Sequence, residues 1–286
     1  MLQLEEIVPD FVAQIDRFPF HAMDGQVISQ LRAAWTRYPV LRLRNGEIGD
    51  AEQVAFTRAL GPIFLPRLVH EGKHDDFAEI LVVSNKKRAD GSAAGDLGDY
   101  EVKWHTDTWW VDRPPSAAIL RAIQIPASGG DTHFCNMYAA FASLPEKTKS
   151  RLHGLCIHHQ TVLDTYGAVR RGMEQPSSSD VATWPGVDHP VVRRHVDSGK
   201  PCLYLGAAPE WQSIVGMAQS EARALLDELW RHATDSAHRW SQTWAQGDML
   251  VWDNRCLMHH RDAFDSGSLR VMHRTTVEGE RPVAAA

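Results

Sequence analysis

Short alternating segments dominate the pattern of apolar and polar positions along the chain. Apolar and polar side chains alternate at 38–44, and further strand-like runs occupy 79–84, 116–125, 131–137, 238–244, 248–252 and 269–277. The runs 189–196 and 202–206 flank a turn at 197–200, a pattern that predicts a hairpin. Runs of this length, bounded by turn residues, are typical of β-strands.

A smaller part of the chain repeats at helical spacing. A helix is predicted over 24–36, with Asp24 as its N-cap. A second is predicted from Asp50 to Gly61, with Gln53 completing a capping box. Two more are predicted at 136–151, with a break at Pro145, and from Ser220 through the segment SEARALLDELWRHA.

Strands and helices do not alternate regularly, which argues against a parallel doubly wound sheet. The pattern favours a mainly β protein, a β-sandwich or jelly roll with helices packed outside. No internal repeat or interdomain linker is visible, so we expect one domain over residues 1–286.

Composition narrows the class of protein only a little. The chain has 286 residues, 43% of them hydrophobic and 23% charged, and its net charge of -6 argues against a nucleic-acid-binding surface. Its four cysteines form no Cys-x-x-Cys motif, which favours reduced thiols in the cytoplasm. The acidic start lacks the pattern of a signal peptide, and no apolar run reaches the length of a membrane span.

Two long segments, 85–100 and 164–188, are rich in small and polar residues. Long loops in a compact domain are usually either lids or surface excursions. We predict that 164–188 is a lid over the functional site, with a plain surface loop as the alternative.

The most informative local pattern is His-x-Asp, which occurs four times, at 74/76, 105/107, 195/197 and 260/262. The pair at 195/197 runs into a turn, the pair at 74/76 lies in a charged segment, and the pair at 260/262 is predicted to lie beyond a strand end. Only His105 and Asp107 lie in a strand-like run, KWHTDTWW, where alternation places their Cα atoms about 7 Å apart on one face. Taken alone, this pattern favours a half-buried hydrogen-bonded pair over a metal site.

Two further segments change that balance. A glycine turn with the sequence SGGDT ends at Thr132, and a run WDNRCLMH ends at His259, eleven residues before Arg270. Together with WHTD, these motifs resemble the taurine/2-oxoglutarate dioxygenase family, which includes phenoxyalkanoate and alkylsulfate dioxygenases. The resemblance extends from about Arg37 to Pro282 and implies a double-stranded β-helix (jelly-roll) core.

The resemblance implies an Fe(II)- and 2-oxoglutarate-dependent dioxygenase that uses molecular oxygen and oxidises a small organic substrate. Two histidines and one carboxylate are the ligand set of such non-haem iron oxygenases, and here they are His105, Asp107 and His259. Arg270 and Thr132 are expected to bind the far carboxylate of 2-oxoglutarate. His260, next in the chain, is expected to face the opposite side of an extended segment.

For the substrate, the resemblance points to Trp110 and Arg274, and so to an anionic compound. The segment at 63–66 and Glu101 depart from the pattern of taurine enzymes, so taurine itself is not expected. We expect a homo-oligomer with no nucleic-acid or membrane partner. A metal-dependent hydrolase and a non-catalytic jelly-roll binding protein stay open as alternatives.

Overall fold

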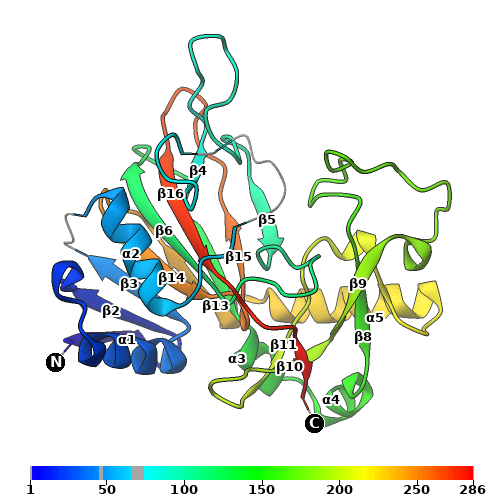
Figure 1. Ribbon diagram of the computed structural model, residues 1–286. Helices are drawn as coiled ribbons and strands as arrows, with labels where there is room; N and C mark the ends of the chain where they lie inside the picture. Colours follow the sequence, from blue (N-terminus) through cyan, green and yellow to red (C-terminus); the bar gives the residue numbers. More distant parts are fainter. Residues whose placement is uncertain (1, 45–47, 66–71, 73, 286) are drawn as a thin grey trace.

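The computed structural model describes residues 2–44, 48–65, 72 and 74–285, and its largest element is a seven-stranded sheet (Figure 1). The strands run in the order β1-β2-β3-β14-β6-β16-β4, and all neighbours are antiparallel except β2 and β3. Their bounds are β1 (Leu4–Val8), β2 (Val12–Asp16), β3 (Val40–Arg44), β14 (Met249–Asp253), β6 (Ala117–Gln124), β16 (Val271–Val277) and β4 (Leu81–Ser84).

A four-stranded antiparallel sheet faces the large one. Its order is β13 (Arg239–Gln242), β7 (Thr132–Asn136), β15 (Leu257–Arg261) and β5 (Val102–His105). Two three-stranded sheets extend the molecule: β11 (Pro201–Leu203), β10 (Val192–Arg194) and β17 (Val283–Ala284), and β12 (Gln212–Ile214), β8 (Cys156–Gln160) and β9 (Gly186–Pro190).

Helices cover the outside of the large sheet. Leu31 of α1 (Gly25–Arg37) and Phe56 of α2 (Asp50–Leu60) join a core with Ile119 of β6 and Val251 of β14. The other helices, α3 (Met137–Ala142), α4 (Glu146–Leu152) and α5 (Gln219–Ala233), lie among the smaller sheets, as Figure 1 shows. Within the described residues, no helix is long and apolar enough to cross a membrane.

The opposite face of the large sheet packs on the four-stranded sheet. Leu120 and Trp252 point into this space, and Phe134 of β7 meets the ring of Trp252 edge-on at 5.6 Å. Because β6 and β14 are buried on both faces, they read as continuous apolar runs instead of alternating ones. The structure confirms the predicted mainly β jelly-roll core with flanking helices.

Several predicted boundaries need correction. The cap of α2 is Gly49, whose amide donates to Glu52 Oε2 at 2.8 Å, whereas Gln53 is fully buried and donates to the carbonyl of His273. The cap of α5 is Ala218, so Ser220 lies inside the helix. Pro145 does separate two helices, as predicted.

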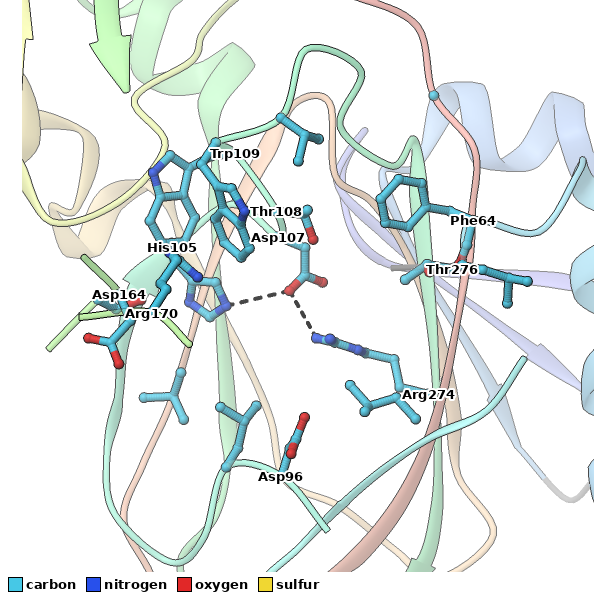
Figure 2. Close-up of a pocket in the computed structure, with 18 of the residues that line it drawn as sticks. Phe64, Asp96, His105, Asp107, Thr108, Trp109, Asp164, Arg170, Arg274 and Thr276 are labelled. Carbon is cyan, nitrogen blue, oxygen red and sulfur yellow. Dashed lines mark hydrogen bonds and ion pairs between the residues drawn. The ribbon is translucent and has the colours of Figure 1, made fainter. Parts of the chain in front are cut away.

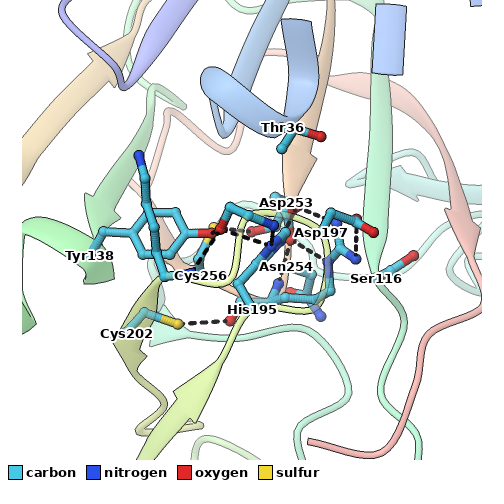
Figure 3. A network of polar contacts seen from close by, with 12 residues as sticks. Thr36, Ser116, Tyr138, His195, Asp197, Cys202, Asp253, Asn254 and Cys256 are labelled. Atoms are coloured by element: carbon cyan, nitrogen blue, oxygen red, sulfur yellow. Dashed lines mark hydrogen bonds and ion pairs between the residues drawn. The ribbon is translucent and has the colours of Figure 1, made fainter. Parts of the chain in front are cut away.

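A buried ionic network ties the end of β14 to the β10–β11 hairpin (Figure 3). Asp253 accepts hydrogen bonds from Nε and Nη2 of Arg255, at 2.9 and 2.7 Å, and from Nε2 of His195 at 2.9 Å. Arg255 also pairs with Asp197 at 2.8 Å. His195 and Asp197, predicted as simple turn residues, therefore hold a hairpin to the core.

We predict that Asp253→Ala lowers the free energy of unfolding by about 3–5 kcal/mol, because it leaves the buried Arg255 without its main counter-charge. Burial alone raises the pKa of Asp253, but Arg255 and His195 reverse this and hold it below its usual range. The stabilisation is therefore present above pH about 4 and is lost as the pH falls further.

Urea denaturation of both proteins from pH 7 to pH 3 would measure this. The control is Asp227→Ala, which removes an exposed pair with Arg223 on α5 and should cost about 0.5 kcal/mol or less. Equal losses in the two variants would contradict the role given to the network.

Candidate active site

The pairing of β5 with β15 brings two histidines together between the sheets. His105 and His259 are direct partners across the antiparallel pair, and their rings lie 4.1 Å apart between centroids. Asp107 Oδ1 lies 3.6 Å from His105 Nε2 and 3.9 Å from His259 Nε2 (Figure 2 shows His105 and Asp107). All three side chains are buried, and one donor atom from each lies within 4.8 Å of the others.

Asp107 reaches this position by leaving the strand, not by continuing it. Strand β5 ends at His105, and Thr108 has a positive φ of 53°. Asn254 fixes the intervening backbone: its Oδ1 accepts from the amide of Asp107 at 2.8 Å, and its Nδ2 donates to the Asp107 carbonyl at 2.9 Å. The predicted in-strand position of Asp107 was wrong, because a side-chain clamp from 147 residues away replaces strand pairing here.

The donor set fits a divalent iron ion. His105 Nδ1 donates to the carbonyl of Lys103 at 2.8 Å, which leaves Nε2 as a free electron-pair donor facing Asp107. Burial lowers the pKa of His259 well below its usual value, which keeps its imidazole neutral. Asp107 Oδ2 is buried and accepts no hydrogen bond from the described residues. Burial alone raises the pKa of Asp107, but Arg274 and the two histidines lower it overall, so the carboxylate is charged.

A second feature of the space between the sheets is the buried Arg270. Its side chain is 1% exposed, and neither Nε nor Nη2 has a hydrogen-bond partner among the described residues. Burial, reinforced by the nearby Arg261, lowers the pKa of Arg270 to about 9. A desolvated guanidinium with unused donors is a site for an anion, above all for a carboxylate.

The glycine turn before β7 makes room for this arginine. A side chain at Gly130 would place its Cβ 3.2 Å from both Cδ and Nε of Arg270, and the φ of Gly130 is 71°. Thr132 follows at the start of β7, buried, and its hydroxyl accepts from Trp244 Nε1 at 3.0 Å while keeping its own hydrogen to donate. Phe134, two residues on and thus on the same face, stacks on His259.

A cavity of about 950 Å³ opens onto His105 and Asp107. Its wall is largely apolar and aromatic, with contributions from Phe64, Leu81, Leu97, Tyr100, Trp109 and Trp110. Trp109 and Trp110 both line it, whereas Trp104 lies against His260, at 5.3 Å between ring centroids. Trp109 is thus both a buried core residue and part of the cavity wall.

Three of the described arginines line this cavity, Arg113, Arg170 and Arg274, and Figure 2 shows the last two. Arg274 donates from Nη1 to Asp107 Oδ1 at 2.9 Å. Arg170 stacks over the ring of Trp110 at 3.6 Å, and its Nη2 is buried with no hydrogen-bond partner among the described residues. No sequence pattern pointed to Arg170, because it lies in a polar loop with no recognisable motif.

The remaining His-x-Asp pairs are not part of the cluster formed by His105, Asp107 and His259. His74 accepts backbone amides of its own turn at Nδ1 and lies 3.1 Å from Asp50 at Nε2. His260 lies inside β15, not beyond a strand end, and contacts Glu101 at 2.6 Å.

Comparisons with known proteins agree with this geometry. The family model described as "Taurine catabolism dioxygenase TauD, TfdA family" matches residues 3–276, so the likeness begins well before Arg37 and includes β1 and β2. The chain is 31% identical over 286 residues to an alpha-ketoglutarate-dependent 2,4-dichlorophenoxyacetate dioxygenase of a Burkholderia species, covering 97% of this chain and 94% of the relative. It is 33% identical over 270 residues to pentalenolactone F synthase of Streptomyces arenae, covering 88% and 86%.

Among solved structures, AAD-2 in complex with Mn(II) and N-oxalylglycine superposes with a TM-score of 0.78 at 25% identity, over 99% of this chain and all of the other. These likenesses confirm the expected dioxygenase class, with iron as the metal cofactor and 2-oxoglutarate and oxygen as co-substrates. They favour this class over the hydrolase and the binding-protein alternatives. The chain belongs to the TauD/TfdA family of 2-oxoglutarate-dependent dioxygenases.

Proposed function

We propose that the chain oxidises, by hydroxylation, a C–H bond of a small anionic compound with a sizeable apolar body. The observation that carries this proposal is one buried space in which a His/His/Asp cluster opens onto a largely apolar cavity whose wall includes Arg170 and Arg274. When bound, Fe(II) and 2-oxoglutarate would supply the electrons that activate O2 for attack on a substrate C–H bond, with release of succinate and CO2.

In this proposal, His105, Asp107 and His259 hold the iron. Lys103 fixes the ring of His105 through its carbonyl, Arg274 orients Asp107 through Oδ1, and Asn254 fixes the backbone on both sides of Asp107. Such supporting contacts keep ligands in place before the metal arrives.

Arg270 and Thr132 are proposed to bind the far carboxylate of 2-oxoglutarate. The unused Nε and Nη2 of Arg270 match two carboxylate oxygens, and the hydroxyl hydrogen of Thr132 is available as a further donor. Because the guanidinium is buried, an incoming carboxylate meets little competition from water.

For the substrate, we propose that its apolar body lies against Trp110 and that its anionic group lies between Arg274 and Arg170. The named substrate of one relative, 2,4-dichlorophenoxyacetate, has both features.

Arg170 lies in the segment 164–188, which we propose as a lid. Its first residues, including Tyr166, line the cavity, whereas its later part contains the short helix η2 (Val181–Thr183) and enters β9.

We also propose that residues 1–286 act as one domain, in the cytoplasm and as a homo-oligomer. One continuous hydrophobic core links the seven-stranded and the four-stranded sheets with α3 and α5, which supports a single domain. The four cysteines are free thiols, in keeping with a reducing compartment. The open edge of β1, with Leu4 exposed on it, offers a surface for a second copy.

Asp107→Ala is expected to abolish succinate formation and to lower Fe(II) affinity strongly, because two remaining ligands cannot hold the ion firmly. Metal retained after gel filtration under anaerobic conditions and succinate release would measure the two effects. The control is His74→Ala, which alters another His/Asp cluster whose ring nitrogens already have partners. Full iron retention in Asp107→Ala would remove this residue from the ligand set.

Arg270→Lys is expected to raise the 2-oxoglutarate concentration needed for half-maximal turnover by about tenfold or more, since lysine keeps the charge but loses the two-donor geometry. Thr132→Val should show the same defect more weakly, as it removes one neutral donor. Titration of 2-oxoglutarate against succinate release checks both. The proposal fails if the requirement is unchanged while the affinity for the organic substrate falls.

A succinate-release screen over carboxylates, sulfonates and sulfate esters, each paired with an uncharged analogue, tests the substrate class. With the best anionic substrate, Arg170→Gln should raise KM about tenfold, the effect of losing about 1.5 kcal/mol of charged hydrogen bonding. The same variant should lose the slowing of hydrogen exchange at 164–180 that substrate and 2-oxoglutarate produce together in the parent protein.

The matched control is Arg171→Gln, which removes the same charge from the exposed neighbour. Preference for the uncharged analogues, or equal effects of the two substitutions, would contradict an anionic substrate held by Arg170.

A further inference from the structure

The fourth His-x-Asp pair belongs to a row of polar side chains on the outer face of the four-stranded sheet. His260 in β15 is the direct partner of His133 in β7, and His133 is the partner of Ser241 in β13. Glu101 extends the row at the edge, immediately before β5, and Asp262 follows the end of β15. Strand alternation places this row on the face opposite His259 and Thr132.

The donor atoms in this row converge. His133 Nε2 lies 2.8 Å from Asp262 Oδ2, and His260 Nδ1 lies 3.7 Å from Asp262 Oδ1. One donor atom from each of the three residues lies within 4.8 Å of the others. Neighbouring ligands of a metal with bonds of about 2.1 Å are about 3 Å apart, so these atoms need to move little to share one ion.

One nitrogen in the cluster, His260 Nδ1, is buried and has no hydrogen-bond partner among the described residues. The carboxylate of Glu101 accepts from His260 Nε2 at 2.6 Å, which places the ring hydrogen on Nε2. Nδ1 then carries a bare lone pair that is buried, has no hydrogen-bond partner among the described residues, and faces the carboxylate of Asp262. Two electron-rich groups face each other here with no donor between them, an arrangement that a cation would stabilise.

The other ring, His133, now contacts Asp262 through Nε2 at 2.8 Å and can offer this nitrogen to a metal. His133 Nδ1 lies 2.7 Å from the hydroxyl oxygen of Ser241, which can donate or accept. If a cation takes Nε2, the ring hydrogen moves to Nδ1 and Ser241 accepts it, so no hydrogen bond is lost there. Glu101 and Ser241 thus orient the two rings from behind, as partners of metal-bound histidines usually do.

A second cluster of similar composition shows what a closed arrangement looks like. In the group of Asp50, His74 and His273, His74 accepts two backbone amides at Nδ1, so its Nε2 carries the hydrogen and donates to Asp50. Arg121 also donates to Asp50 and adds a positive charge. In each of these contacts an N–H group already donates to Asp50, so no bare lone pair faces the carboxylate and no place is left for a cation.

We propose that His133, His260 and Asp262 form a second metal site, for a transition-metal ion such as Zn²⁺, on the face of the sheet opposite the iron ligands. Two imidazole nitrogens and one carboxylate oxygen suit Zn²⁺, with water completing the coordination. The site shares no residue with the iron cluster, so each can be removed alone. Asp262 is also held to the turn before β7, since its amide donates to the carbonyl of Asp131, so the ion would join the ends of β7 and β15.

Equilibrium dialysis against Zn²⁺, with metal counted per chain, tests the proposal. The metal-free protein should bind two ions, one in each cluster, because Zn²⁺ also accepts the iron ligands. His260→Gln and Asp262→Asn should each bind one. Asp107→Ala should also bind one, and Asp107→Ala combined with His260→Gln should bind none.

The matched control is His158→Gln, which alters another half-buried His–Asp pair whose two ring nitrogens both have hydrogen-bond partners. It should keep both ions. His133→Gln provides a second route to the same loss, and the thermal unfolding midpoint of each metal-free variant shows that it is folded. One ion in the parent protein, or two in folded His260→Gln and His133→Gln, would overturn the proposal.

Discussion

The antiparallel pairing of β5 with β15 is the constraint on which the site depends. It sets His105 directly opposite His259, so two metal-competent nitrogens meet without help from any loop. A strand cannot shift its register by a single residue without turning every one of its side chains to the other face of the sheet. A slip here would carry His259 outward and His260 inward, and would separate the proposed iron ligands. Strand β15 is paired with β5 on one side and with β7 on the other, so its register is held from both sides.

The same alternation gives this sheet two chemically different faces. The inner face presents His259 and Thr132 to the space between the sheets, and the outer face presents His260 and His133 to the surface. Arg270, which immediately precedes β16, is buried with unused donors. Burying a charge without a partner is costly, and in the proposed function the carboxylate of 2-oxoglutarate would remove that cost.

How far the sequence predicted this arrangement depended on the range of the interactions involved. The helix at 24–36 was predicted well because its cap is local: Asp24 accepts from Val27 three residues on. The position of Asp107 was predicted wrongly because its backbone is held by Asn254, and nothing within KWHTDTWW reports that clamp. His195 was assigned to a turn for the same reason, since its partner Asp253 lies 58 residues away. The proposed iron ligands were assigned through motifs, and Arg170, which belongs to no motif, was not among the residues predicted.

Residues that motifs reveal and residues that motifs miss lie in different parts of the fold. His259 and Thr132 lie on strands that are paired on both sides, and His105 lies on the edge strand β5, paired with β15 and bridged to Ala207. Much of the cavity wall, including Phe64, Leu97, Tyr100 and Arg170, comes from connecting segments outside the named helices and strands. Changes in those segments alter the shape and charge of the cavity without moving the strands beneath. A common reaction centre can therefore serve different substrates, and the motifs that reveal the reaction carry little information about the compound on which it acts.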